Sequence, residues 1–120
     1  MLNELILVGR LAKDPEIATT ENNHKRAIIT LAVQRKFKNI DGIYDTDFIR
    51  VVMWNNIAAT TNEYCKTGDL VAIKGRLQVS NYVDTEGNNK SITEVVAEKI
   101  TFLSSKRVPP LTNNDTETEE

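Results

Sequence analysis

The segment that decides the fold reads Phe48-Ile49-Arg50-Val51-Val52-Met53-Trp54. Successive side chains of a β-strand point to opposite faces, so this segment is expected to present two different surfaces. The odd positions are all apolar and suit a hydrophobic core: Ile49, Val51 and Met53. The even positions place two aromatic rings and a cation on the face away from that core: Phe48, Arg50, Val52 and Trp54.

Working outward, four more segments have the composition of strands and one has that of a helix. The additional strands are predicted over residues 5–8, 28–35, 70–82 and 91–103, with a bulge near Ala97-Glu98. Helical spacing over residues 55–66 predicts a helix with an inner side formed by Ile57, Ala58, Tyr64 and Cys65. Gly68 follows as its C-terminal glycine. Turn signals stand at Asp41-Gly42 and at residues 86–89.

The order of these elements predicts an all-β protein with the OB fold. That fold is a five-stranded Greek-key β-barrel, here with one short helix between the third and fourth strands. The pattern alone leaves a small β-sandwich open. Residues 1–103 form the predicted domain. Residues 104–120 contain Pro109-Pro110, several Asn and Thr and the terminal acids, so we expect a short disordered acidic tail.

The strand predicted over residues 70–82 repeats the division into two faces. Its inward positions are expected to be Val71, Ile73, Leu77 and Val79, and its outward positions include Lys74, Arg76, Gln78 and Tyr82. Phe37 adds another ring among cations, in Arg35-Lys36-Phe37-Lys38. One outer surface therefore collects aromatic rings and basic side chains.

This combination is typical of proteins that bind unpaired nucleic acid. A base stacked on an aromatic ring contributes about 1–3 kcal/mol without reading sequence, and nearby cations bind phosphates. The candidate stacking residues are Phe37, Phe48, Trp54 and Tyr82. The candidate phosphate ligands are Arg10, Arg35, Lys36, Arg50, Lys74 and Arg76. The alternative is that a partner subunit covers these rings.

Charge permits this function without requiring it. The formal net charge is −2, but four of the 17 acidic residues lie in the last six positions. The chain before these positions contains 13 acidic and 15 basic residues, so its formal net charge is about +2.

Other functions find little support in the sequence. His24 is the only histidine, in a polar segment where we expect it to be exposed, and Cys65 is the only cysteine, expected to be buried. We therefore predict no catalytic residues, no metal site and no cofactor. No apolar run approaches the roughly 20 residues of a membrane span, and the N-terminus lacks a secretory signal, so we expect a soluble cytoplasmic protein.

Several motifs follow one another in a familiar order: Leu7-Val8-Gly9-Arg10-Leu11, Lys13-Asp14-Pro15-Glu16, residues 48–54, Gly75-Arg76-Leu77 and residues 93–98. In this the chain resembles the bacterial single-stranded-DNA-binding protein family over roughly residues 1–103. The resemblance implies sequence-independent binding of single-stranded DNA in replication, recombination and repair, in association with the nucleoid. It also implies a homotetramer, a dimer of dimers, with Leu5, Ile6, Leu7 and Val8 at a subunit interface.

Two departures modify these expectations. Members of this family usually end in acids followed by proline and phenylalanine, which recruit repair proteins; this chain ends Thr118-Glu119-Glu120, so such recruitment is not expected. Asn55-Asn56 and Ser80 stand where basic residues are common, which implies weaker, more salt-sensitive binding. Both favour an accessory or mobile-element paralogue. The alternative function is an OB module that binds protein or structured RNA.

Overall fold

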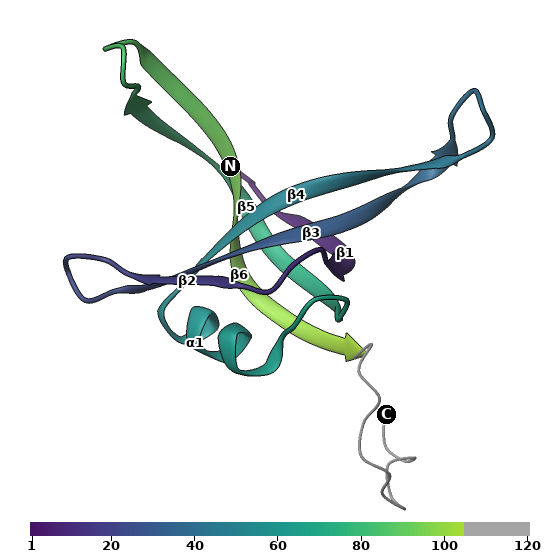
Figure 1. Cartoon of the computed structure of the whole chain (residues 1–120), viewed down its shortest axis with the longest axis horizontal. Helices are drawn as coiled ribbons and strands as arrows, with labels where there is room; N and C mark the ends of the chain where they lie inside the picture. Colours follow the sequence, from purple (N-terminus) through teal and green to yellow (C-terminus); the bar gives the residue numbers. More distant parts are fainter. Residues whose placement is uncertain (105–120) are drawn as a thin grey trace, which may run out of the picture.

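The computed structural model describes residues 1–104, and within this range it contains six strands and one helix (Figure 1). In chain order they are β1 Leu5–Leu11, β2 Glu16–Thr19, β3 Lys25–Lys38, β4 Tyr44–Trp54, α1 Asn55–Tyr64, β5 Leu70–Val83 and β6 Asn89–Ser104. Apart from Ser104, which ends β6, the predicted tail lies outside the described residues. The strand β2 was not predicted, because its four residues are too few for a visible alternation.

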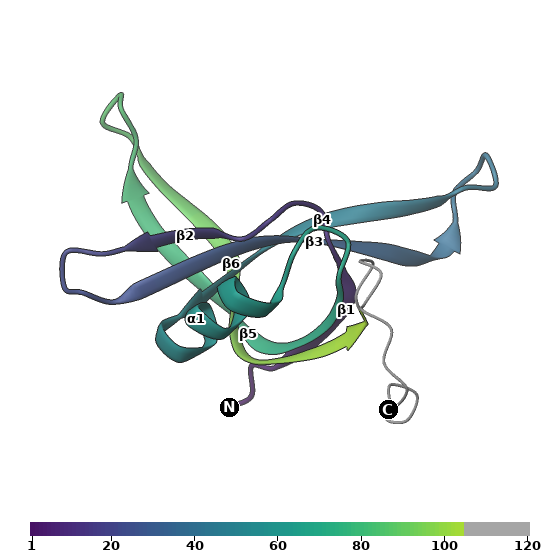
Figure 2. The ribbon, with the colours of Figure 1, turned by 60° about the horizontal axis from the view of Figure 1, so that its bottom comes forward.

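Strand pairing closes the sheet into a barrel. The sheet order is β1-β5-β6-β4-β3-β2, and an additional β1–β3 pairing joins the two ends of the five longer strands. β4 and β6 are parallel, and the other pairs are antiparallel. α1 connects β4 to β5 and packs against β3 (Figure 2). The predicted OB fold is confirmed, and closure of the barrel excludes the β-sandwich.

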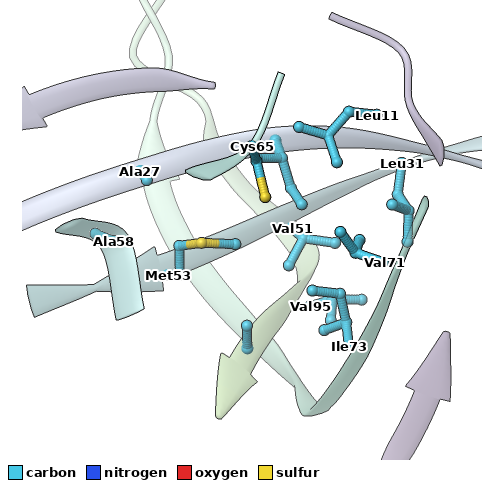
Figure 3. Close-up of a cluster of buried hydrophobic side chains, with 12 residues drawn as sticks. Leu11, Ala27, Leu31, Val51, Met53, Ala58, Cys65, Val71, Ile73 and Val95 are labelled. Atoms are coloured by element: carbon cyan, nitrogen blue, oxygen red, sulfur yellow. The ribbon is translucent and has the colours of Figure 1, made fainter. Parts of the chain in front are cut away.

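The core consists of the side chains that point into the barrel (Figure 3). Val51 and Met53 are fully buried and Ile49 packs against the core, as the alternation in β4 predicted. The buried side of α1 and the residue after it contains Ala58, Thr61 and Cys65. The prediction for Tyr64 was wrong. The buried residues Ala58, Thr61 and Cys65 follow one another at intervals of three and four residues, and on a helix Tyr64 then lies at the margin of the side that they form. Its ring is exposed and lies 6.1 Å from that of Phe102.

Two local predictions concern irregular backbone. The bulge near Ala97-Glu98 is confirmed, because Lys74 pairs with Lys99 and Gly75 pairs with Ala97, which leaves Glu98 unpaired between them. Gly68 was wrongly placed as a helix C-terminal glycine. α1 ends at Tyr64, and Gly68, with φ of 90°, lies in the turn where the Asp69 N–H donates to the Lys66 carbonyl.

Three hairpins extend beyond the barrel as arms: β2–β3, β3–β4 and β5–β6 (Figure 1). The β5–β6 arm explains an error in the predicted core. Leu77 and Val79 are on the same face of β5 as the buried Val71 and Ile73, yet they are 47% and 60% exposed. Their orientation follows the alternation, but on the arm no other layer of the barrel faces them.

Candidate nucleic-acid interface

The outer surface of β3 and β4 forms a ladder of directly paired residues. Its rungs, which we call the β3–β4 outer face, are Arg26–Trp54, Ile28–Val52, Thr30–Arg50, Ala32–Phe48 and Gln34–Thr46. The ladder lies outside the barrel because the alternating residues, among them Ala27, Ile29 and Leu31, are fully buried.

Phe48 and Trp54 are the two aromatic residues of this face. Their exposed fractions are 66% and 38%. Trp54 is six positions after Phe48 in extended chain, which places the two residues about 20 Å apart along the strand. Val52, predicted to face outward, is only 4% exposed but lies outside the core cluster, between its neighbours Ile28 and Val96. The face therefore offers two separate stacking platforms with an apolar floor between them.

Three of the predicted phosphate ligands lie on this surface. Arg50 stands between the two rings on β4. Arg10 on β1 pairs with Ala32, whose other neighbour is Phe48, and donates through Nη1 to the Gly68 carbonyl at 2.9 Å. Arg76 on β5 pairs with Val96, which pairs with Val52, and its Nε lies 3.7 Å from Glu98 Oε2. Cations thus flank the aromatic platforms from three strands.

Two other predicted ligands are placed elsewhere. Arg35 donates to Asp47 from Nε and Nη2 at 3.0–3.2 Å. This hydrogen bonding raises the pKa of Arg35 and lowers that of Asp47. Asp47 precedes Phe48 in β4, so the pair belongs to the opposite face. Lys74 pairs with Ile6 in the β1–β5 ladder and its Nζ is 3.2 Å from Glu4 Oε1.

The remaining stacking candidates lie on the arms. Phe37 and Lys36 are exposed on the β3–β4 arm, where the register shifts between Gln34 and Lys38. Tyr82, exposed on the β5–β6 arm, pairs directly with Lys90. The structure therefore brings Phe48 and Trp54 onto one face and distributes Phe37 and Tyr82 over two separate arms.

Sequence reasoning missed two basic residues beside these rings. One is Lys90, which pairs with Tyr82. The turn predicted at residues 86–89 joins the two strands in a hairpin, and counting back from this turn could have indicated the pairing. Arg26 is the other: it pairs with Trp54, and the alternation in Lys25-Arg26-Ala27-Ile28 already places it outward. His24 is exposed, as predicted, and its Nδ1 lies 3.4 Å from Asn55 Oδ1. Cys65 is buried, also as predicted.

The four residues predicted at a subunit interface divide by face. Leu5 and Leu7 pack against the core, whereas Ile6 and Val8 are exposed on the outside of β1. Residues 5–10 pair with β5 along one edge, but only Arg10 and Leu11 pair with β3 along the other.

Within residues 1–104 no group of three or more His, Cys, Asp and Glu side chains is arranged to hold a metal ion. No helix in this range is both long and apolar enough to cross a membrane.

Comparison with known proteins identifies the family. The model of the single-strand binding protein family matches residues 2–103. The chain is 44% identical over 117 residues to a single-stranded DNA-binding protein of Staphylococcus aureus, covering 98% of this chain and 72% of the relative. It is 41% identical over 106 residues to single-stranded DNA-binding protein B of Bacillus subtilis, covering 88% of this chain and 94% of the relative. On the strength of the family match and these identities, the chain belongs to the single-strand binding protein family.

Proposed function

We propose that this protein binds single-stranded DNA without sequence preference, in replication, recombination and repair. The observation that carries the proposal is the β3–β4 outer face, where Phe48 and Trp54 are exposed on either side of Arg50. Within residues 1–104 Arg50 has no salt bridge, so its charge is available to a phosphate. Family membership supports the same function.

The mechanism requires binding and no chemical step. Bases stack on Phe48 and Trp54, while Arg10, Arg50 and Arg76 neutralise the phosphates between them. Phe37 with Lys36, and Tyr82 with Lys90, extend the path onto the two arms. Stacking needs only the π-face that all bases share, so the binding does not depend on sequence. We expect the protein in the cytoplasm, associated with the nucleoid.

The alternative, an OB module for protein or structured RNA, is less well supported, since the named relatives bind single-stranded DNA. A competition assay separates the two: oligo-dT should displace a labelled single strand, and duplex DNA or a folded RNA hairpin should not. Displacement by the hairpin alone would favour the alternative.

Stacking on Trp54 predicts a fluorescence change. Trp54 is the only tryptophan, so its emission reports on one position. We expect saturating poly-dT to quench this emission, because a stacked base contacts the indole ring. The control is Phe48→Ala, which keeps the tryptophan and should retain the quench at saturation. Independent proof of binding with unchanged emission would exclude Trp54 as a stacking platform.

We further propose that copies of the chain associate through β1, in a homotetramer as the family resemblance implies. The exposed Ile6 and Val8 would be removed from water, and the edge of β1 that lacks a strand partner along residues 5–9 offers free backbone hydrogen-bonding groups.

A charge on this surface should break the assembly. Ile6 is 70% exposed, so Ile6→Glu should leave the barrel folded but place a carboxylate in the interface. We expect light scattering to report about four chains for the unmodified protein and a smaller species for the variant. Ile40→Glu is the matched control, because Ile40 is 99% exposed in a turn. An unmodified protein that is monomeric at micromolar concentration would refute the proposal.

A further inference from the structure

Arg26 lies next to Trp54 on the β3–β4 outer face. The β3–β4 register pairs Arg26 directly with Trp54, and on its other side Arg26 pairs with Ala18 of β2. Side chains directly opposite each other in an antiparallel pair have Cβ atoms about 4.5–5.5 Å apart. The long arginine side chain therefore lies between the indole of Trp54 and the small side chain of Ala18.

The guanidinium of Arg26 has no partner within residues 1–104. Its Nε is buried and makes no hydrogen bond. Lys13, Arg35, Lys74 and Arg76, by contrast, each lie within 4.0 Å of a carboxylate oxygen. A buried donor without an acceptor is unfavourable, and its presence calls for a physical reason. An acceptor supplied by a ligand, toward which the Arg26 side chain turns on binding, would be such a reason.

Nearby acidic groups do not fill this role. Glu16 is diagonal to Arg26 across the β2–β3 ladder, but its Oε2 lies 2.7 Å from Lys13 Nζ. That hydrogen bond and the charge of Lys13 lower the pKa of Glu16, and the charge of Arg50 adds to this. His24 of the β2–β3 turn lies close to the same end of the face, with its Nδ1 3.4 Å from Oδ1 of Asn55, the residue after Trp54. The cation thus stands beside an exposed ring without a carboxylate partner in the described part of the chain.

We propose that Arg26 binds the phosphate of the nucleotide whose base stacks on Trp54. A guanidinium is always charged and offers planar N–H donors that match phosphate oxygens, so an anion is the ligand that satisfies it. The inference rests on the proposed function, and it adds a phosphate ligand at the end of the β3–β4 outer face where Asn55 and Asn56 carry no charge.

A salt titration of oligo-dT binding tests the proposal. Loss of one phosphate contact on a single strand should reduce the log–log salt slope by about 0.7. We expect Arg26→Gln to show this reduction, with weaker binding at low salt and convergence with the unmodified protein at high salt. Lys66→Gln is the matched control, since it removes the same charge from an exposed loop position that is not part of any rung of the β3–β4 outer face. Its slope should not change.

Two further measurements complete the test. Arg26→Lys keeps the charge and should keep the slope, and saturating oligo-dT should still quench Trp54 in Arg26→Gln. If Arg26→Gln lowers the melting temperature, Arg26→Met is used in its place in the salt titration, because methionine keeps an unbranched apolar side chain without the charge. A lower affinity with an unchanged slope and a lost quench would mean that Arg26 only positions the indole, and the proposal would be overturned. Failure of the unmodified protein to bind oligo-dT would instead refute the proposed function.

Discussion

Phe48→Ala is expected to weaken the binding of oligo-dT by about 5- to 150-fold, the loss of one stacked base worth about 1–3 kcal/mol. Phe48 is 66% exposed and paired with the small Ala32, so its ring contributes little to the barrel. The free energy of unfolding should therefore change little. Fluorescence anisotropy of labelled oligo-dT measures the first quantity, and urea denaturation measures the second.

Val51→Ala is the matched control on the same strand. Val51 is fully buried in the core, so its truncation should leave a cavity and lower the free energy of unfolding by about 1–3 kcal/mol. The affinity of the folded fraction for oligo-dT should be unchanged. If instead Phe48→Ala destabilises the protein and Val51→Ala weakens binding, the assignment of the two faces of β4 is wrong.

Gly75→Ala should produce a large loss of stability although it adds only one methyl group. Gly75 is buried on β5 at the bulge, and a Cβ there would overlap the backbone carbonyl oxygen of Val96 on β6. Backbone cannot rotate aside as a side chain can, so the strands must separate. We expect the free energy of unfolding to fall by about 3 kcal/mol, the upper range for overpacking.

The control for Gly75→Ala is Asn81→Val, an exposed position on the same strand. A β-branched residue is favoured in strands, so thermal denaturation should show little change for this variant. An unaltered melting temperature for Gly75→Ala would mean that β5 and β6 can move apart at the bulge without cost, contrary to the tight packing described here.

The faces of β4 could be predicted because the alternation of side chains is a local property of an extended chain. Phe48 and Trp54 face outward and Val51 and Met53 face inward in the structure, as their odd and even positions indicated. The same local rule failed to predict burial on β5. Leu77 has the inward orientation, but burial depends on whether another layer faces it, and the length of the β5–β6 arm beyond the barrel is not encoded in the alternation.

The partners of the basic residues were likewise beyond the sequence. The alternation places Arg50 outward on β4 and puts Arg35 on the face of β3 that Ile29 and Leu31 occupy, but it does not reveal that Asp47 binds Arg35 there. An uninterrupted ladder continued from the pair Lys38–Tyr44 would place Trp54 opposite Ile28. The shift in register between Gln34 and Lys38 places it opposite Arg26 instead.

By itself, the sequence determined the OB fold, the outward aromatic residues of β4 and the family, because strand order and alternation are written directly in the chain. Only the tertiary structure decided that Arg26 stands beside Trp54, that Lys74 lies beside Ile6, and that Leu77 is exposed. The physical reason is that strand register, bulges and the reach of a hairpin beyond the barrel arise from contacts between segments distant in sequence. Such contacts leave no local pattern of their own.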